Sequence, residues 1–346
     1  MGQYATLDDA LASMRNAGPE LRNGLTNHAP MAAEALCAMG RGDAVPAWVE
    51  RYRTGLLPMP PRVDPIAPND WQAVLAHEER FADWYELIAE ELRDSAWQAV
   101  LERWVPRLAP GISAAATHGV IRVGHAVRAL DEALTPTRID ELARGIAYWA
   151  ATYQSLPTDL SAQRASEPQQ AVKGIALVPV ERRRFAGTIT SALTALDEDP
   201  SFRTVIGRAT LDENPGTVIS QLTQTFAGVY LANAHDVLTT IVFIHSVTSA
   251  AAVRSMVAHI SDVSTRMLLP YLWQAQCALY AAFGSRAPSD SVTSPGESRD
   301  NLIEQAVANG DEHVIKFTEA CLREDAITPA PVYRAAASQA IKMMSA

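Results

Sequence analysis

Residues 237–253, VLTTIVFIHSVTSAAAV, form the most apolar stretch of the chain and contain no charged residue. The stretch is interrupted by His245 and by several serines and threonines. It is also shorter than the roughly 20 consecutive apolar residues that cross a bilayer. We therefore expect a buried core helix here rather than a membrane span.

Helical signals also dominate on both sides of this segment. Apolar residues recur at helical spacing within 81–92, and Thr6 followed by Asp8 and Asp9 is typical of an N-cap with an acidic first turn. We predict helices over residues 30–39, 97–108, 112–134 and 138–153. Residues 174–180, the one short apolar run bounded by helix-breaking residues, are the only candidate β-strand. Residues 156–179 and 284–299 are predicted to be long loops.

These signals predict an all-α protein, a multi-helix, bundle-like single globular core with long connecting loops. We expect one domain over residues 1–346. The alternative division has lobes over 1–155 and 180–346, joined by the loop 156–179.

Composition narrows the class of protein. The 346 residues are 48% hydrophobic and 20% charged, which is typical of a globular chain, and the net charge of −10 argues against nucleic acid as a partner. The cysteines Cys37, Cys277 and Cys321 are odd in number and form no C-x-x-C pair, which fits a reducing compartment. The N-terminus lacks the basic and apolar regions of a secretory signal. We expect a cytoplasmic protein without a membrane partner.

Histidines are the most informative residues. His118 and His125 lie in HGVIRVGHAVR, residues 118–128, with Gly119 and Gly124 beside them. Seven residues are close to two helical turns, so both rings face one side of a helix with their Cα atoms about 10 Å apart. Either the rings lean together on a glycine-loosened helix or one of them contacts the substrate or orients a ligand. The glycines indicate a close approach of a ligand or of another helix, at about 1 kcal/mol of helix stability each.

Two further segments carry candidate site residues. His313 and Lys316 are three residues apart and share one helix face, whose neighbours Ile315 and Phe317 indicate burial. A buried lysine has a lowered pKa, and its neutral amine is nucleophilic, although the side chain can also reach solvent along its stem. His245 lies in the uncharged core segment, where its ring nitrogens need either a metal or neighbours such as Ser246 or Thr248.

With these segments in view, the chain resembles the questin oxidase-like family. The resemblance extends over nearly the whole chain and is carried by NHAPMAAEAL at 27–36, a proline-rich stretch at 52–65 followed by Trp71, HGVIRVGHAVR at 118–128, IHSVT at 244–248 with Ala251 and Arg254, and DEHVIK at 311–316. Members of this family act in aromatic polyketide metabolism and oxidise anthraquinones with ring opening, by dioxygenase-type or Baeyer-Villiger-like chemistry.

The resemblance implies a non-haem iron site built from four histidines and a carboxylated lysine. The lysine would be Lys316, with possible metal ligands His28, His118, His125, His245 and His313 competing for the four histidine places. We also expect His118, His125 and Arg122 to be catalytic residues. The implied partners are a small aromatic substrate and O2.

The expected activity is thus that of an oxygenase, an oxidoreductase. Trp149, Tyr153 and Tyr230 are candidate walls for a polycyclic ring. The chain has no G-x-G-x-x-G after a strand, so a flavin on the usual fold is excluded and no NADPH site is recognisable. Two alternatives stay open, namely a zinc or metal-free hydrolase or cyclase that uses histidine and lysine as acid and base, and a non-catalytic helical protein that binds small molecules.

Overall fold

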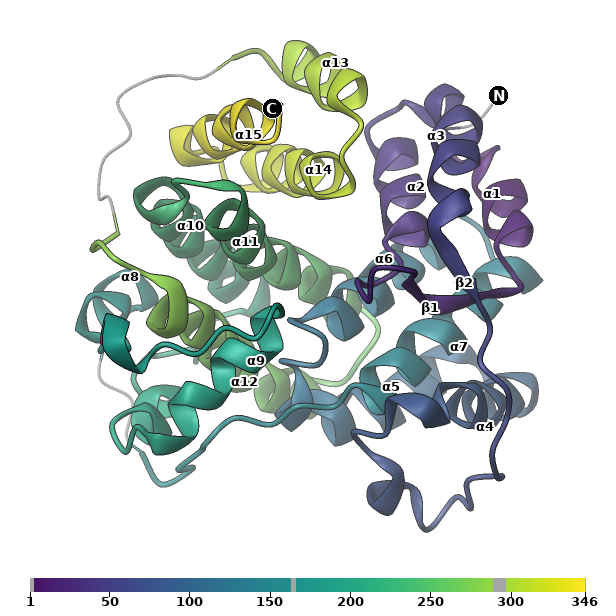
Figure 1. Cartoon of the computed structure of the whole chain (residues 1–346), viewed down its shortest axis with the longest axis horizontal. Helices are drawn as coiled ribbons and strands as arrows, with labels where there is room; N and C mark the ends of the chain where they lie inside the picture. Colours follow the sequence, from purple (N-terminus) through teal and green to yellow (C-terminus); the bar gives the residue numbers. More distant parts are fainter. Residues whose placement is uncertain (1–2, 163–165, 289–296, 346) are drawn as a thin grey trace.

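The structure, a computed structural model, describes residues 3–162, 166–288 and 297–345. Helices dominate it, as the sequence predicts, and they share one globular core (Figure 1). The longer helices are α1 Leu7–Ser13, α2 Ala29–Ala38, α3 Val45–Tyr52, α4 Phe81–Asp94, α5 Trp97–Leu108, α6 His118–Glu132, α7 Pro136–Ala151, α10 Pro215–Asn233, α11 Val237–Val257, α12 Asp262–Phe283, α13 Arg299–Asn309, α14 Glu312–Ile327 and α15 Pro331–Met343. Two short helices, α8 Pro168–Ala171 and α9 Ile189–Leu193, lie in the long connection between α7 and α10.

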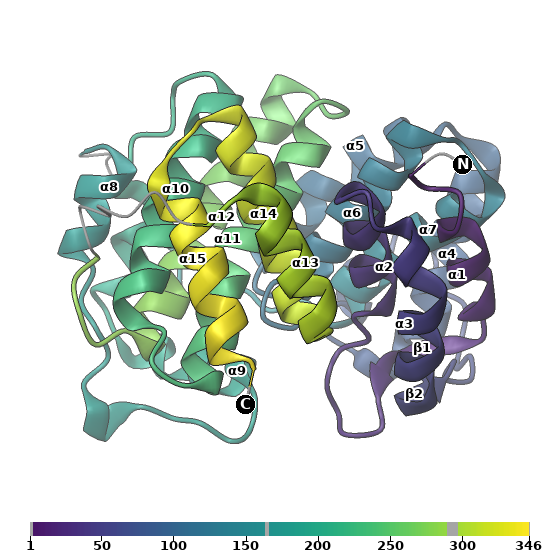
Figure 2. The same cartoon turned by 90° about the horizontal axis from the view of Figure 1, so that it is seen from above.

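The helices gather in two groups along the chain. Seen from above, α1 to α7 occupy one side of the molecule and α8 to α15 the other (Figure 2). Helices α6 and α11 pack against each other between them, and α11 also packs on α10, α12 and α14. Helix α11 is long and apolar enough to pass a test for a membrane span, but most of it is buried inside the protein. It is the core helix that the sequence predicts.

Local sequence explains where the helices that carry the site begin. Helix α11 starts with a capping box in which the Asp236 side chain accepts from the backbone N–H of Thr239, and the Thr239 hydroxyl contacts the N-cap in return. Helix α14 starts at Asp311, whose Oδ1 accepts from the backbone N–H of His313 at 2.8 Å. Helix α2 has Pro30 in its first turn.

The two glycines of the doubled-histidine block allow close helix packing. A Cβ at Gly124 would lie 2.6 Å from Cα of Ala252 on α11, and a Cβ at Gly119 would lie 2.7 Å from Cα of Trp149 on α7. Both distances are too short for any side chain. Of the two interpretations of these glycines, helix packing is the one that the structure supports.

Several local predictions were wrong. The strands are β1 Ala17–Leu21 and β2 Leu56–Pro58, which pair antiparallel, and residues 174–180 form no strand. The helix predicted from residue 112 begins only at His118. Ala115, Ala116 and Thr117 have φ of 44°, 57° and 72°, which lies in the left-handed region. Nothing in the sequence signals this turn because alanine and threonine rarely adopt that conformation.

Candidate metal centre

Histidines from four different helices meet at one point of the core. His28 precedes α2, His118 begins α6, His245 lies in the middle of α11, and His313 lies in the first turn of α14. All four are buried. Nε2 of His118 lies 2.5 Å from Nε2 of His28 and 3.0 Å from Nε2 of His245. The His313 ring stands edge-on to the His28 ring, with the ring centroids 4.6 Å apart.

The outer nitrogen of each ring has its own acceptor. Nδ1 of His28 lies 3.2 Å from Oε1 of Glu312, and Nδ1 of His313 lies 3.3 Å from Oδ1 of Asp311. Nδ1 of His245 lies 2.6 Å from the carbonyl oxygen of Ile241, and Nδ1 of His118 contacts the carbonyl oxygen of Ala115. Since these acceptors take the Nδ1 protons, the Nε2 atoms of the neutral rings carry lone pairs.

The inward-facing Nε2 atoms therefore cannot satisfy one another. Two lone pairs at 2.5 to 3.0 Å repel unless a cation lies between them. Burial lowers the pKa of His28, His118 and His245 well below the usual value, and the nearby charges of Lys316 and of the other imidazoles lower these pKa values further. The rings are thus neutral, which is the form that binds metals. Imidazole nitrogens suit iron, zinc and copper.

Lys316 lies on α14, three residues after His313, and is buried with 2% of its surface exposed. Burial lowers the pKa of its amine from 10.5 to about 8, although Glu312 and Asp311 oppose the shift. Within the described residues it makes no hydrogen bond or ion pair. Its charge contributes to the lowered pKa values of His28, His118 and His245, so the amine lies within electrostatic range of these imidazoles.

The left-handed turn before α6 shapes this site. It brings the carbonyl oxygen of Ala115 onto Nδ1 of His118, which orients the ring. A left-handed backbone conformation costs about 1–3 kcal/mol of folding free energy for each residue that is not glycine. Ala115 and Ala116 also line the adjoining cavity.

His125 lies in a different environment from the other candidate ligands. Its Nδ1 is 2.6 Å from Oε2 of Glu34, and Arg128 bonds both Glu34 and Glu319. Tyr4 donates to Glu34 from the outer side. We name these five residues the buried ion cluster. Because the two rings lie two turns apart on α6, the structure separates His125 from His118 instead of bringing them together.

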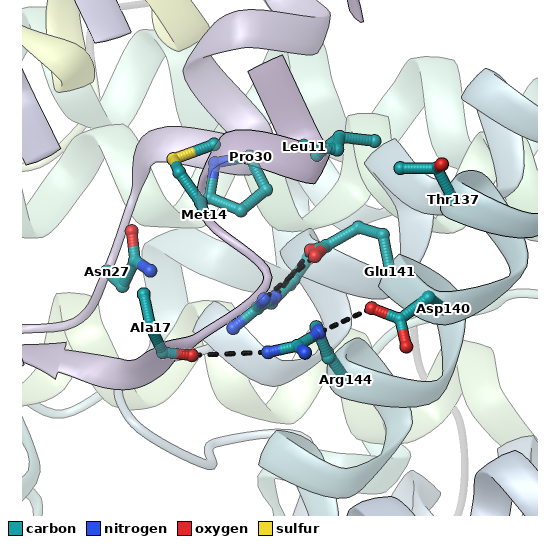
Figure 3. A pocket seen from close by; sticks show the side chains of 10 residues that line it. Leu11, Met14, Ala17, Asn27, Pro30, Thr137, Asp140, Glu141 and Arg144 are labelled. Carbon is teal, nitrogen blue, oxygen red and sulfur yellow. Dashed lines mark hydrogen bonds and ion pairs between the residues drawn. The ribbon is translucent and has the colours of Figure 1, made fainter. Parts of the chain in front are cut away.

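Arg122 is also outside the histidine group. Its Nε and Nη2 donate to the two carboxylate oxygens of Glu141 at 2.6 and 2.9 Å, and the pair is buried. It borders a small pocket of about 10 Å³ around Asp140, Glu141 and Arg144 (Figure 3). This space holds little more than one water molecule. The expectation that His125 and Arg122 join His118 in catalysis is therefore not supported by their positions.

A cavity of about 590 Å³ opens beside the histidines. Its wall includes His28, His118, His245 and His313 together with apolar and hydroxyl side chains, among them Leu25, Thr26, Tyr148, Tyr153, Phe185, Ile189, Leu238 and Ile241. Of the three aromatic wall candidates only Tyr153 lines it. Trp149 donates its indole N–H to Gly111 in the core, and Tyr230 packs on Phe317. Sequence reasoning missed Thr26, Tyr148 and Phe185, for which no motif exists.

Comparison with known proteins identifies the family of the chain. A family model described as questin oxidase-like matches residues 25–321, a span that contains the four converging histidines and Lys316. No curated protein matches the chain. Since the match covers most of the sequence, the earlier resemblance is confirmed, and membership implies an oxidoreductase. The chain belongs to the questin oxidase-like family.

Proposed function

We propose that the protein is a metal-dependent oxygenase, with non-haem iron, that oxidises a polycyclic aromatic or quinone polyketide by ring cleavage or a Baeyer-Villiger-like insertion. The observation that carries the proposal is the meeting of unprotonated Nε2 atoms at the end of a large cavity. A cavity of about 590 Å³ is in the range of small-molecule sites.

His28, His118, His245 and His313 would hold the metal, and bound iron would supply the activation of dioxygen. The side chains and carbonyls on the Nδ1 atoms would fix the rings in the binding tautomer. His125 is left out of this set because its ring lies two turns along α6 from His118 and contacts none of the other imidazoles in the described part of the chain.

Lys316 is the fifth proposed ligand, as a carbamate. The ammonium first loses a proton, and the neutral amine then adds CO2 and releases a second proton, so an anionic oxygen donor takes the place of the cation. The buried amine is free of ion pairs in the described part of the chain, so no partner has to be displaced. A carbamate would also explain why no carboxylate faces the Nε2 atoms directly.

The cavity walls would hold the substrate. Apolar side chains such as Ile189 and Ile241 suit the faces of a fused ring system, and the turn at Ala115 and Ala116 leaves room beside His118 because these residues are small. The burial of the histidines would keep bulk water from the reacting atoms.

The test is metal analysis of freshly purified protein together with O2 uptake on an anthraquinone-type substrate. We expect about one iron per chain and uptake that depends on substrate. The Lys316→Ala variant should lose both, whereas His235→Ala, an exposed histidine outside the cavity, should keep both. If the protein contains zinc instead of iron and takes up no O2, the hydrolase alternative is favoured. If it binds an aromatic ligand but contains no metal and takes up no O2, a carrier is favoured.

O2 and NADPH stoichiometry then separates the two oxidative reactions. Insertion of both oxygen atoms in a ring cleavage needs no further reductant. A Baeyer-Villiger-like insertion of one atom consumes a pair of electrons for each turnover. NADPH oxidation that is coupled to O2 uptake would therefore identify the second reaction.

A further inference from the structure

Two buried hydroxyl groups form a pair on the cavity wall. Oγ1 of Thr26, from the loop between β1 and α2, lies 2.8 Å from the hydroxyl oxygen of Tyr148 on α7. Thr26 is 8% exposed and Tyr148 is 2% exposed, and both line the cavity. Neither hydroxyl has another partner in the described part of the chain.

This pair holds an unused hydrogen-bond donor. Two hydroxyl groups have two protons, and the bond between them uses one. The other proton has no acceptor from the protein. A buried donor without an acceptor is costly, so an oxygen atom of water or of a ligand completes the pair. Thr26 is two residues from His28, so a ligand held here also adjoins the histidines.

A second chamber adjoins the pair. It has a volume of about 220 Å³ and shares Glu20, Glu78, Tyr148 and Thr152 with the main cavity. Its remaining wall is largely apolar and includes Phe81. Tyr148 therefore borders both spaces.

The two glutamates limit the charge of that ligand. Glu20 is half-buried, and burial together with the nearby charge of Glu78 raises its pKa. A carboxylate on the ligand would be repelled here, whereas a neutral carbonyl or hydroxyl oxygen would not.

We propose that Thr26 and Tyr148 form an anchoring subsite that donates a hydrogen bond to a neutral carbonyl or hydroxyl oxygen of the ligand. The second chamber holds the edge of the ligand beyond that oxygen. The inference rests on the proposed function in one respect, that the cavity is the substrate site. Thr26 and Tyr148 are positioning residues, because they orient the ligand and take no part in oxygen chemistry.

The experiment compares two probes built on the same three-ring carbon skeleton. Anthraquinone has carbonyl oxygens, and dihydroanthracene has the same fused rings without them. Binding is followed without O2 by tryptophan fluorescence in the wild type and in the double variant Thr26→Val, Tyr148→Phe, which keeps both shapes. We expect the variant to lose about three- to tenfold in anthraquinone affinity, the usual range for one hydrogen bond, and to bind dihydroanthracene as the wild type does.

The matched control is Thr223→Val, Tyr333→Phe. That pair is also a buried threonine and tyrosine, with the hydroxyl oxygens 2.9 Å apart, but it lies outside the cavity lining. It should leave the affinity for both probes unchanged. Wild-type protein supplies a measurement that needs no variant, since anthraquinone should bind at least tenfold more tightly than its carboxylated derivative.

Anthraquinone affinity within twofold of wild type in the Thr26, Tyr148 variant would overturn the proposal, and so would equal losses for both probes. If the wild type bound anthraquinone and its carboxylated derivative equally tightly, the proposed exclusion of negatively charged ligands would be wrong. The proposed function fails in a different way, by absence of iron or of O2 uptake. A protein without iron that still selects anthraquinone through Thr26 and Tyr148 would keep the subsite and lose the oxygenase.

Discussion

Helix α6 carries two histidines that the sequence makes look alike and that the fold separates. His118 faces other imidazoles, and its Nε2 has no hydrogen donor. His125, seven residues later, faces Glu34 in the buried ion cluster. Helix α2 runs beside both, since it supplies His28 to the first histidine and Glu34 to the second.

The difference lies in what faces the inner nitrogen of each ring. Both environments place a carboxylate on Nδ1, since Glu312 and Asp311 contact rings of the histidine group and Glu34, whose charge Arg128 balances, contacts His125. In the histidine group the Nε2 atoms face one another at 2.5 to 3.0 Å, whereas His125 contacts no other imidazole in the described part of the chain. The converging Nε2 atoms are therefore what makes His118, and not His125, a candidate metal ligand.

The largest expected effect is on metal affinity, when one histidine of α6 at a time is replaced by alanine. We expect His118→Ala to lower metal affinity by at least about a hundredfold, because loss of groups that only orient ligands already costs about 10- to 100-fold. His125→Ala should bind metal as the wild type does. Equilibrium metal titration of both variants measures this. Equal losses in the two would contradict the division of α6 into a ligand and a structural histidine.

The second effect concerns folding stability. Glu34→Gln should lower the free energy of unfolding by about 3 kcal/mol at neutral pH, the lower end for a broken buried ion pair, because Arg128 loses one of its two carboxylate partners and keeps Glu319. The matched control, Glu304→Gln, breaks an ion pair of Arg41 with an exposed glutamate and should change the free energy of unfolding by less than about 1 kcal/mol. Urea unfolding of the two variants tests the comparison.

The same carboxylate has a defined pH dependence. Burial raises the pKa of Glu34, but Arg128 and His125 lower it by more, so the folded protein holds it well below 4.5. A depressed pKa stabilises the fold above 4.5 and loses that stabilisation as the pH falls toward the folded value. The stability gap between wild type and Glu34→Gln should therefore shrink below pH 4.5. A constant gap would contradict the ion pairing.

The smallest effect is predicted for the contact that holds the two histidine helices together. Gly124→Ala should destabilise the protein by about 1–3 kcal/mol, because the new methyl meets the backbone of Ala252. Gly145→Ala is the graded control, because its nearest neighbours, Cγ2 and the backbone nitrogen of Val123, lie 3.2 Å away and have to shift less than Ala252 does. Thermal unfolding of the two variants shows which of them has the lower melting temperature. A larger loss for Gly145→Ala would exclude Gly124 as the tighter contact.

Much of the fold was predictable from the sequence because long helices with an apolar face have a recognisable periodic pattern of apolar residues. Residues 97–108 form a helix with the predicted bounds, and most of residues 237–253, from Thr240 on, lie in the core. The turn at 115–117 was not predictable, since its alanines carry no turn signal and the surrounding packing imposes their backbone angles.

The candidate site was predictable only in its residue types. The histidines and Lys316 were chosen from their motifs, whereas the convergence of His28, His118, His245 and His313 without His125 follows from packing between helices. Thr26 and Tyr148 meet across 122 residues of sequence and have no local pattern at all. Contacts of this range depend on tertiary structure, which spacing within one segment does not encode.

The histidine group joins both ends of the chain, since His28 and its partner Glu312 are 284 residues apart. During synthesis, α14 leaves the ribosome after α2, α6 and α11, so a growing chain at that stage has three of the four imidazoles and no complete site. An ion bound by all four histidines would crosslink these distant segments of the chain. Such a crosslink would raise the free energy of unfolding, because it closes a long loop and is bound only by the folded protein. Iron supply would then set the lifetime of the finished protein as well as its activity, and chelation would first loosen the contact of α2 with α14.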